Sequence, residues 1–568
     1  MMASEQQAVV LDRDEHSAAV TSREPAGRLR RHRRWLRRHR RWLLPLVVAV
    51  LLAQMAVAMV TTAVRQTPTI DEPVYVGTAA VYLREHSLRY NPEHPPLGKL
   101  VIAVGVALAD PHVDTSFAGD QGQVGRHLLY ESGNDPWRLM LWARLPVIAL
   151  TLLFGLAVFG FARDLVGAAG GVAALALYTF SPDVIAHGSL ATLDAPATGF
   201  LLTSVWLLWR ARRRALPYLP LAGVALGAAL ATKMTALPAV PVLLALAAVS
   251  LWHGRPADRR RALLRAASAA GVVALAAVAV VWAAYLVVDP RLRWTSQQHI
   301  PAVHGLRGLL VHLLPFPEAY RDGMRIQFGF ENEPWQGFLF GRLYTGSLWY
   351  YLPVALLVKT PLGMLALWAA GGVALVTVRR LRPAAPYLLA PTAVLLAAAV
   401  QGSRNFGTRY ALFMPVFLAV AAGCVLAVRW RWGPAVTGAL VLFVAVSSLR
   451  TYPFYLPYSN EAFGGPARTH LRLHDSNVDW GQDLGRLADR LRERYPGERI
   501  WLVYKGSGVP SFYGIHASDP RTVPARDVHG LLVVSDSAVA KAKGRLAELV
   551  DGSRAVDEVG HSITIYRR

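Results

Sequence analysis

The sequence has one cysteine in 568 residues and few charged side chains. A single thiol, Cys424, forms neither an intrachain disulfide nor a cysteine-based zinc site, so both are excluded. Charged residues make up 17% of the chain, whereas about 25% is usual in soluble proteins. Together with 54% hydrophobic residues, this composition argues against a soluble multidomain enzyme.

Acidic residues are also scarce relative to basic ones, with 37 Asp and Glu against 60 Lys and Arg. The basic residues stand in short clusters between long apolar runs. This pattern predicts a multispan membrane protein in contact with membrane lipids, and no nucleic-acid partner.

The apolar runs predict about eleven membrane-spanning helices. The first, from Leu43 to Val64, exceeds the core of a signal peptide and is long enough to cross a bilayer of roughly 30 Å. The others are expected near residues 138–162, 168–186, 195–209, 218–232, 236–252, 266–288, 361–378, 385–400, 410–428 and 434–449.

The basic clusters predict the orientation of these spans. Residues 1–42 are expected to be a mostly disordered, arginine-rich N-terminus in the cytoplasm. An odd number of spans then places the loops 65–137 and 289–360 and the tail from Arg450 outside. The clusters that fall in cytoplasmic loops are Arg210/Arg212/Arg213/Arg214, Arg255/Arg259/Arg260/Arg261/Arg265, Arg379/Arg380/Arg382 and Arg429/Arg431.

The tail, residues 450–568, has the pattern of a small α/β domain. Leu484, Leu487 and Leu491 repeat at helical spacing, and the segments IWLVY, LLVVS and SITIY are typical of short strands. The predicted fold class is therefore a multispan α-helical membrane domain, residues 43–449, followed by a small α/β domain outside the membrane.

Ionisable residues gather in the loops assigned to the outer face. Asp71 and Glu72 follow the first span in TPTIDEPVY, and a third carboxylate, Asp194, lies in another outer loop. The first loop continues with NPEHPPLGKL, which contains His94 and Lys99, and the cations expected at the same level are Arg144, Arg404 and Arg409. Carboxylates and guanidinium groups at one membrane level suit an anionic lipid headgroup.

At these motifs the sequence resembles the protein O-mannosyltransferase-like glycosyltransferases of the GT-C fold, a family that includes the bacterial aminoarabinose transferases for lipid A. The resemblance covers most of the chain, and the order and spacing of the motifs carry it. They are Asp71-Glu72 followed by HPPLGKL, RLP at Arg144, LATLDAP at Asp194, LVKTPLGML at Lys359, FGTRYALFMP at Arg409 and DSNVDWGQDLGRLADRL in the tail.

The resemblance implies transfer of a mannose-like or arabinose-like sugar from a polyprenyl-phosphate carrier to an acceptor hydroxyl, with inversion, outside a bacterial inner membrane. It implies Asp71 as the general base, with Glu72 and Asp194 orienting the acceptor or helping to bind a cation. The substrate-binding residues that it implies, with the donor phosphate assigned first to Arg144, are Arg144, Lys99, His94, Arg404 and Arg409.

The residues fit this chemistry independently of the resemblance. No nucleotide-sugar pool exists outside the membrane, and no glycine-rich fingerprint follows a strand, so a lipid-anchored donor is expected and an organic cofactor is not. A phosphate leaving group needs no protonation, so one carboxylate base suffices. A divalent cation stays open, although His94 and the scattered carboxylates lack the spacing of a closed zinc site.

Two alternatives remain at this point. The acceptor is a protein, an envelope glycan or a lipid. A polyprenyl-linked lipid flippase or transporter is the alternative from another functional class, and it would gain support if Lys233 and Lys359 faced one cavity at mid-depth. The gathering of ionisable residues at one membrane face favours the transferase, because transport sites usually lie near the midplane.

Overall fold

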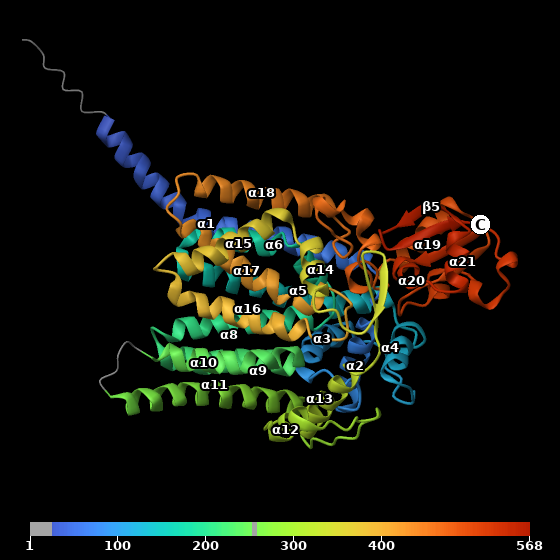
Figure 1. Cartoon of the computed structure of the whole chain (residues 1–568), viewed down its shortest axis with the longest axis horizontal. Helices are drawn as coiled ribbons and strands as arrows, with labels where there is room; N and C mark the ends of the chain where they lie inside the picture. The colour runs from blue at the N-terminus through green and yellow to red at the C-terminus, as the bar shows by residue number, and fades with distance from the viewer. Residues whose placement is uncertain (1–24, 253–257) are drawn as a thin grey trace, which may run out of the picture. The chain divides into compact units, whose positions relative to one another are not determined.

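The computed structural model describes residues 25–252 and 258–568 (Figure 1). Contacts between residues divide the chain into two units, 1–49 and 50–568. Helix α1 (Pro25–Arg65) begins well before the apolar run that starts at Leu43. Two parts of the sequence predictions, residues 1–24 of the N-terminus and Arg255 of a basic cluster, lie outside the described residues.

The second unit is mainly helical up to residue 451. A β-hairpin of β1 (Gln336–Leu339) and β2 (Arg342–Thr345) interrupts the helices. The helices are α2 (Glu72–Glu85), α3 (Pro96–Ala109), α4 (Gln121–Tyr130), α5 (Pro136–Val166), α6 (Ala168–Thr179), α7 (Pro182–Gly188), α8 (Asp194–Ala211), α9 (Ala215–Thr232), α10 (Val240–Ser250), α11 (Arg259–Val288), α12 (Gly305–Leu313), α13 (Glu318–Phe330), α14 (Tyr351–Lys359), α15 (Leu362–Thr377), α16 (Ala385–Ala399), α17 (Phe413–Gly423) and α18 (Gly433–Thr451).

Within the described residues, five helices are long and apolar enough to cross a membrane, or up to seven if each of two bent pairs is one span. The five are Trp42–Arg65 of α1, α5, α9, α11 and α18. The pairs are α6 with α7, bent by 61°, and α14 with α15, bent by 119°. The multispan helical character agrees with the prediction, but the count of eleven is not confirmed.

The difference arises where apolar runs break into shorter helices. The run at 236–252 is divided into a 3₁₀ segment, Met234–Ala239 with Pro238 inside it, and α10 of 11 residues. The run at 410–428 likewise divides into a 3₁₀ turn, α17 and a second 3₁₀ segment. Hydropathy records the composition of such a run but not the break in its helix.

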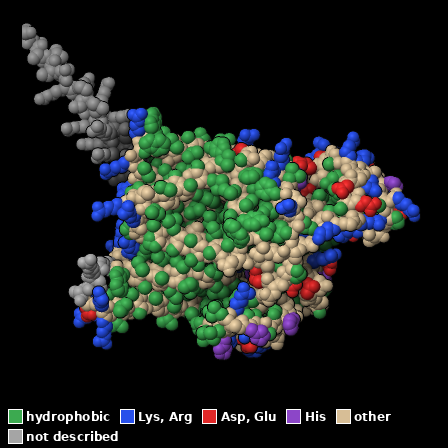
Figure 2. Space-filling view, in the orientation of Figure 1, with side chains coloured by type: hydrophobic (Ala, Val, Ile, Leu, Met, Phe, Trp, Pro, Cys, Tyr) green, Lys and Arg blue, Asp and Glu red, His purple; other side chains and the backbone are tan. Residues whose placement is uncertain are grey.

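Apolar side chains cover most of the visible surface of the helical part, whereas Lys, Arg, Asp and Glu gather over the C-terminal part (Figure 2). Large exposed hydrophobic residues on the candidate spans include Leu153, Leu275 and Leu442, each more than half exposed. A surface of this kind is stable in lipid and unfavourable in water, so it fits a membrane setting.

Close packing of short helices positions the loops that follow α1. Helix α3 packs against α2 and α5. At Gly105 of α3, an added Cβ would lie 1.9 Å from the carbonyl oxygen of Trp142 in α5, so only glycine permits this approach. The contact brings α3 against α5 close to Arg144.

The C-terminal part contains a four-stranded sheet in the order β3-β4-β6-β5. Strands β3 (Ile500–Val503) and β4 (Leu531–Ser535) are parallel, whereas β6 (Ile563–Arg567) is antiparallel to β4 and to β5 (Arg554–Val559). The helices are α19 (Leu484–Arg494), α20 (Asp536–Ala540) and α21 (Arg545–Asp551).

Two apolar clusters hold this sheet between helices. Leu484, Leu487 and Leu491 of α19 are buried against one face, as their spacing predicts. Trp501 and Leu532 pack with Leu549 of α21 on the other. The α/β elements therefore form at the expected segments, although the contacts do not separate residues 450–568 as a unit of their own.

Candidate active site at the first loop

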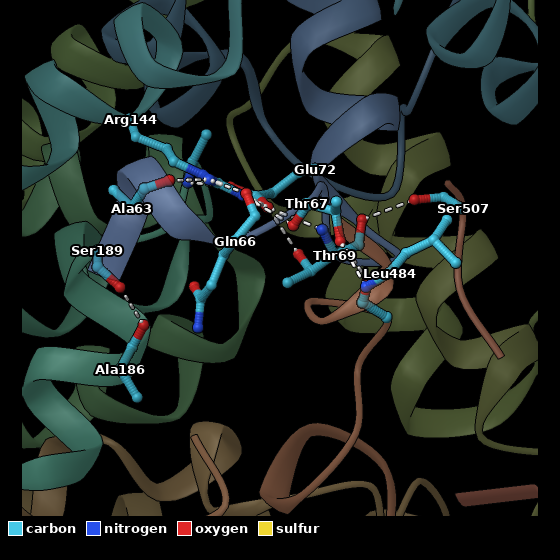
Figure 3. A network of polar contacts seen from close by, with 12 residues as sticks. Ala63, Gln66, Thr67, Thr69, Glu72, Arg144, Ala186, Ser189, Leu484 and Ser507 are labelled. Carbon is cyan, nitrogen blue, oxygen red and sulfur yellow. Dashed lines mark hydrogen bonds and ion pairs between the residues drawn. The ribbon is translucent and has the colours of Figure 1, made fainter. Parts of the chain in front are cut away.

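Glu72 and Arg144 form a buried ion pair at the start of α2 (Figure 3). The Arg144 Nε and Nη2 atoms donate to the two carboxylate oxygens of Glu72 at 2.7 and 2.6 Å. The same carboxylate accepts the backbone N–H groups of Thr69 and Ala191 at 2.9 and 2.8 Å. Burial alone would raise the pKa of Glu72, but Arg144 and these donors hold it below its usual value.

The remaining N–H groups of Arg144 bind backbone carbonyls at the end of α1. Nη1 donates to Ala63 and Gln66 at 2.7 and 2.8 Å, and Nη2 donates to Thr67 at 3.2 Å. All five guanidinium donors are thus in use, and the side chain is 1% exposed. Arg144 therefore anchors the first loop in this structure, and none of its N–H groups is free for the donor phosphate that the sequence predicts it to bind.

The ion pair also changes the expected role of Glu72. Its side chain is completely buried, and both oxygens are taken by Arg144 and by backbone donors. A carboxylate so enclosed has no oxygen free for an acceptor. In this structure Glu72 fixes the turn that carries the neighbouring Asp71, and its predicted role toward the acceptor stays a prediction.

Lys99 is likewise a structural residue. Its buried Nζ donates to the carbonyl oxygens of Asn91 and His94 at 2.7 Å each and to Asn91 Oδ1 at 3.2 Å. Three donors with three acceptors leave this ammonium group satisfied within its own loop. It holds the proline-rich turn 91–95, and its predicted place in substrate binding stays a prediction.

Asp71 and Arg409 form the central ion pair of the candidate site. Arg409 Nη1 lies 2.6 Å from Asp71 Oδ2, and the Asp71 side chain is 26% exposed. Asp71 Oδ1 has no hydrogen bond to any described residue. Arg409, in the 3₁₀ turn Thr408–Ala411, lies with its guanidinium carbon 4.3 Å from the ring centroid of Trp480. The pair joins the first loop to the turn Thr408–Ala411, and Trp480 of the tail packs against it.

Asp194 forms a second ion pair with a lysine. Lys233 Nζ lies 2.5 Å from Asp194 Oδ1, and both side chains are 6% exposed. The charge of Arg409 also acts on Asp194, and the Lys233 ammonium lies 5.5 Å from the ring centroid of Tyr410, the neighbour of Arg409. The two ion pairs therefore belong to one cluster.

Arg404 lies between α16 and the turn Thr408–Ala411 and binds residues at the end of α13. Its Nη2 donates to Gln327 and Glu331 at 2.7 and 3.1 Å. Two buried donors have no hydrogen-bond partner among the described residues, namely Arg404 Nε and Arg409 Nε. Unpaired donors of this kind are costly in a folded protein and suggest a missing acceptor.

His94 lies among the cations of the cluster. Burial together with the positive charges of Lys233, Lys99, Arg404 and Arg409 holds the pKa of His94 well below its usual value. Its ring packs edge-on to Tyr75 at 5.7 Å, and Nδ1 has no partner within the described part of the chain. We therefore expect a neutral imidazole.

The structure thus brings together five of the eight predicted residues, namely Asp71, Asp194, His94, Arg404 and Arg409. Sequence reasoning missed two others as site residues. Lys233 carried a signal, since it is a lone charge between two apolar runs, where ionisable side chains are usually functional. Trp480 carried none beyond its motif, because its contact with Arg409 joins segments 71 residues apart in the sequence.

Comparison with known families gives one match, over part of the chain. Residues 48–294, which hold Asp71, Arg144, Asp194 and Lys233, match the family model described as Dolichyl-phosphate-mannose-protein mannosyltransferase. This part of the chain is PMT-like. The resemblance inferred from the motifs is therefore confirmed.

Solved structures give more distant matches. ArnT from Cupriavidus metallidurans in the apo state has 15% sequence identity and a TM-score of 0.44, over 91% of this chain and 97% of that one. The same protein bound to undecaprenyl phosphate has 16% identity and a TM-score of 0.43, over 92% and 97%. The Pmt1-Pmt2 complex of S. cerevisiae bound to the sugar donor has 21% identity and a TM-score of 0.35, over 44% and 33%. No curated protein sequence gives a significant match.

The PMT-like part does not offer an evident metal site. Among residues 25–252 and 258–568, no group of three His, Cys, Asp or Glu side chains could hold a metal ion. Asp71 and Asp194 each face a cation already, which neutralises the charge that a divalent ion would need. No catalytic step is therefore derived through a metal.

A groove of about 600 Å³ opens beside α11 and α13. Its walls are mainly apolar and aromatic, with Tyr285, Trp294 and Phe316 among them. None of the described residues that line it belongs to the ion-pair cluster. The groove is therefore separate from the site built on Asp71.

The tail segment beside the site contains a buried acid whose ionisation should affect stability. Burial raises the pKa of Asp479 to about 7, with Lys505 opposing the shift and Asp536 adding to it. The pKa of Asp479 is therefore higher in the folded protein than its value of about 3.9 in the unfolded chain. The protonated carboxyl group contributes to the stability of the fold at low pH, and this contribution is lost as the pH rises from about 4 to about 7. We expect Asp479→Asn, which stays neutral, to gain stability relative to the wild type over this range.

Thermal unfolding in detergent at about pH 4.5 and about pH 8 measures this difference. Asp489→Asn is the control, because Asp489 is 66% exposed on α19. A stability difference between Asp479→Asn and the wild type that stays constant with pH would contradict the assignment.

Proposed function

We propose that this PMT-like protein is a membrane glycosyltransferase that moves a mannose-like or arabinose-like sugar from a polyprenyl phosphate to an acceptor hydroxyl outside a bacterial inner membrane. The cluster of two carboxylates with the unpaired donors of Arg404 and Arg409 carries the proposal. Such donors suit a phosphate, and the exposed carboxylate of Asp71 suits the proton transfer.

In the proposed reaction Asp71 is the general base. Its Oδ1 takes the proton of the acceptor hydroxyl while the hydroxyl oxygen forms a bond to the anomeric carbon of the sugar. The bond from that carbon to the phosphate oxygen breaks, and its electron pair leaves with polyprenyl phosphate. A single displacement of this kind inverts the anomeric configuration.

The cations stabilise the charge that develops on the leaving phosphate. Arg404 and Arg409 each keep one buried N–H group free of described partners. Among the described residues Lys233 has one hydrogen-bond acceptor, Asp194, for its three N–H groups, so it can bind a second anion. Placing these groups in advance lowers the cost of forming the anion, since no solvent reorganisation is needed.

We expect Arg404→Gln to weaken donor binding more than turnover. A charge-assisted hydrogen bond contributes roughly 1.5–3 kcal/mol, so KM for the donor should rise by about 10- to 100-fold with kcat less affected. Initial rates with increasing polyprenyl-phosphate sugar measure both constants. The matched control is Arg84→Gln, which removes a largely exposed arginine that pairs with Asp110. Equal KM values for Arg404→Gln and the wild type would remove Arg404 from the donor site.

The experiment that tests the proposed function uses purified protein in liposomes. It is incubated with a panel of polyprenyl-phosphate sugars and with peptide, glycan and lipid acceptors. Mass spectrometry then reads free polyprenyl phosphate and the glycosylated product. Release of polyprenyl phosphate from one carrier identifies the sugar, and the glycosylated product identifies the acceptor class. If none of the carriers in the panel supports turnover, the proposal is contradicted.

The flippase alternative receives less support. Lys233 pairs with Asp194, while Lys359 lies 3.5 Å from Asp183 and donates to the carbonyl oxygens of Leu456 and Asn477 at 2.5 and 3.0 Å. Two lysines fixed by different partners do not form a shared transport site. Carrier movement across the liposome bilayer without sugar release would favour the flippase.

The orientation of the chain is part of the proposal. A cytoplasmic N-terminus and an external tail place the Asp71 cluster on the outer side, where lipid-linked donors replace nucleotide sugars. A reporter fused after Arg568 should give an external signal, and a cytoplasmic signal would contradict this orientation.

A further inference from the structure

The ligand-binding edge of the C-terminal sheet is covered by the chain itself. In α/β sheets, ligands usually bind at the carboxyl ends of parallel strands. Here the loops after β3 and β4 contact the tail segment 475–481 instead. The Asp475 N–H donates to Ser537 Oγ at 2.8 Å, Ser537 Oγ donates to the Asp479 carbonyl at 3.0 Å, and Tyr504 donates to the Gly481 carbonyl at 2.8 Å. Lys505 also pairs with Asp475.

The other side of this segment binds the first loop, directly before Asp71. The Ile70 N–H donates to the Trp480 carbonyl and the Thr67 N–H to the Gln482 carbonyl, both at 3.0 Å. Thr67 Oγ1 donates to Gly481 at 3.0 Å and accepts the Leu484 N–H at 3.2 Å. Figure 3 shows Leu484 and Ser507 meeting the loop from the C-terminal part.

Between these two contacts, Trp480 reaches the guanidinium group that pairs with Asp71. The indole is 1% exposed, and its ring centroid lies 4.3 Å from Arg409 Cζ. Arg409 Nε has no acceptor among the described side chains or carbonyls. The Trp480 ring is therefore a main contact that limits the orientation of the guanidinium group at its Nε side. A cation above a desolvated indole is attracted by the ring electrons.

We propose that the C-terminal sheet domain is part of the active site, in which Trp480 is a positioning residue that orients Arg409 toward Asp71. This inference rests on the proposed function for its effect on catalysis. Residues at the sheet edge form hydrogen bonds with the segment 475–481, and this segment forms hydrogen bonds with the loop 67–70. Within the segment, the Trp480 ring packs against the guanidinium group of Arg409. The domain thus acts on the reaction through Arg409 without contacting the substrate.

The test compares Trp480→Leu with Trp501→Leu. Trp501 is a close control because it is also 1% exposed, lies in the same domain, and has the guanidinium of Arg499 at 4.4 Å from its ring. Both variants lose a buried indole, but only one loses the contact with Arg409. We expect Trp480→Leu to lower kcat by roughly 10- to 30-fold beyond the effect of Trp501→Leu, with a smaller change in KM. Trp480→Phe, which keeps a ring face, should recover part of the loss.

A double-mutant cycle separates positioning from general destabilisation. In an Arg409→Gln background the Trp480→Leu substitution should cost little further activity, because the group that it orients is gone. The effect of Trp501→Leu should be the same in both backgrounds. Additive effects of Trp480→Leu and Arg409→Gln would overturn the proposal.

A second measurement does not depend on activity. An arginine-selective dicarbonyl reagent, read by peptide mass spectrometry, should label Arg409 faster in Trp480→Leu than in the wild type or in Trp501→Leu. Absence of turnover in the wild type would contradict the proposed function alone. Unchanged labelling of Arg409 in folded Trp480→Leu protein would overturn the positioning role.

Discussion

Replacing Asp71 by Asn should lower turnover by about 10²- to 10⁴-fold while leaving donor binding nearly intact. Asparagine keeps the shape of the side chain but cannot accept the acceptor proton. It also removes the charge that pairs with Arg409 Nη1 at 2.6 Å, so the guanidinium remains available to the donor phosphate. Single-turnover release of polyprenyl phosphate measures the chemical step, and equilibrium binding of the carrier measures the affinity.

Asp110→Asn is a suitable control, because Asp110 also accepts a hydrogen bond from an arginine, Arg84, but is 79% exposed. The Asp110→Asn substitution should leave the rate of the chemical step and the affinity for the carrier within a few-fold of the wild type. Turnover of Asp71→Asn at a similar level would exclude Asp71 as the base. Asp194→Asn would then be the next variant to examine.

Replacing Arg144 by Met should destabilise the protein by roughly 3–5 kcal/mol, the cost of leaving one partner of a buried ion pair alone. Glu72 would lose its bidentate partner, and the carbonyls of Ala63, Gln66 and Thr67 would lose their donors. Thermal unfolding in detergent measures the loss, and hydrogen exchange of residues 66–72 shows whether the first loop opens. Donor affinity of the protein that remains folded should change little.

Arg210→Met provides the comparison, because Arg210 also pairs with a carboxylate, Asp164, but is 38% exposed. An exposed pair contributes at most about 1 kcal/mol, so its loss should be much smaller. A folded, stable Arg144→Met protein with weakened donor binding would restore the role that the sequence predicted for this arginine.

The sequence predicted the gathering of charged residues better than their individual roles. Asp71, Asp194 and Arg409 could be grouped because each belongs to a motif in a segment assigned to the outer face. The structural contacts of Arg144 and Lys99 were not predicted, because their partners are mainly backbone carbonyls, at Ala63, Gln66, Asn91 and elsewhere. Carbonyl groups are present at every residue, so no pattern of side chains reveals which of them converge on a cation.

The helices show the same difference between composition and geometry. Hydropathy located the apolar segments, and the heptad-like leucines of α19 gave the buried face correctly. The bend of 119° between α14 and α15 depends on packing and on the turn at Pro361, which a window of hydropathy averages away. Element positions were therefore more predictable than the number of spans.

The hydrogen bonds between the first loop and the tail also set an order of events during synthesis. Thr67 precedes its partner Gly481 by 414 residues. At roughly 5–20 residues per second, the ribosome needs about 20–80 s to make the intervening chain. During this interval the newly made loop carries Asp71 and Glu72 without the tail, while Arg144 is made early enough to anchor it. The ion pair of Glu72 and Arg144 can thus fix the conformation of the loop until the tail has been synthesised. The site is therefore completed last.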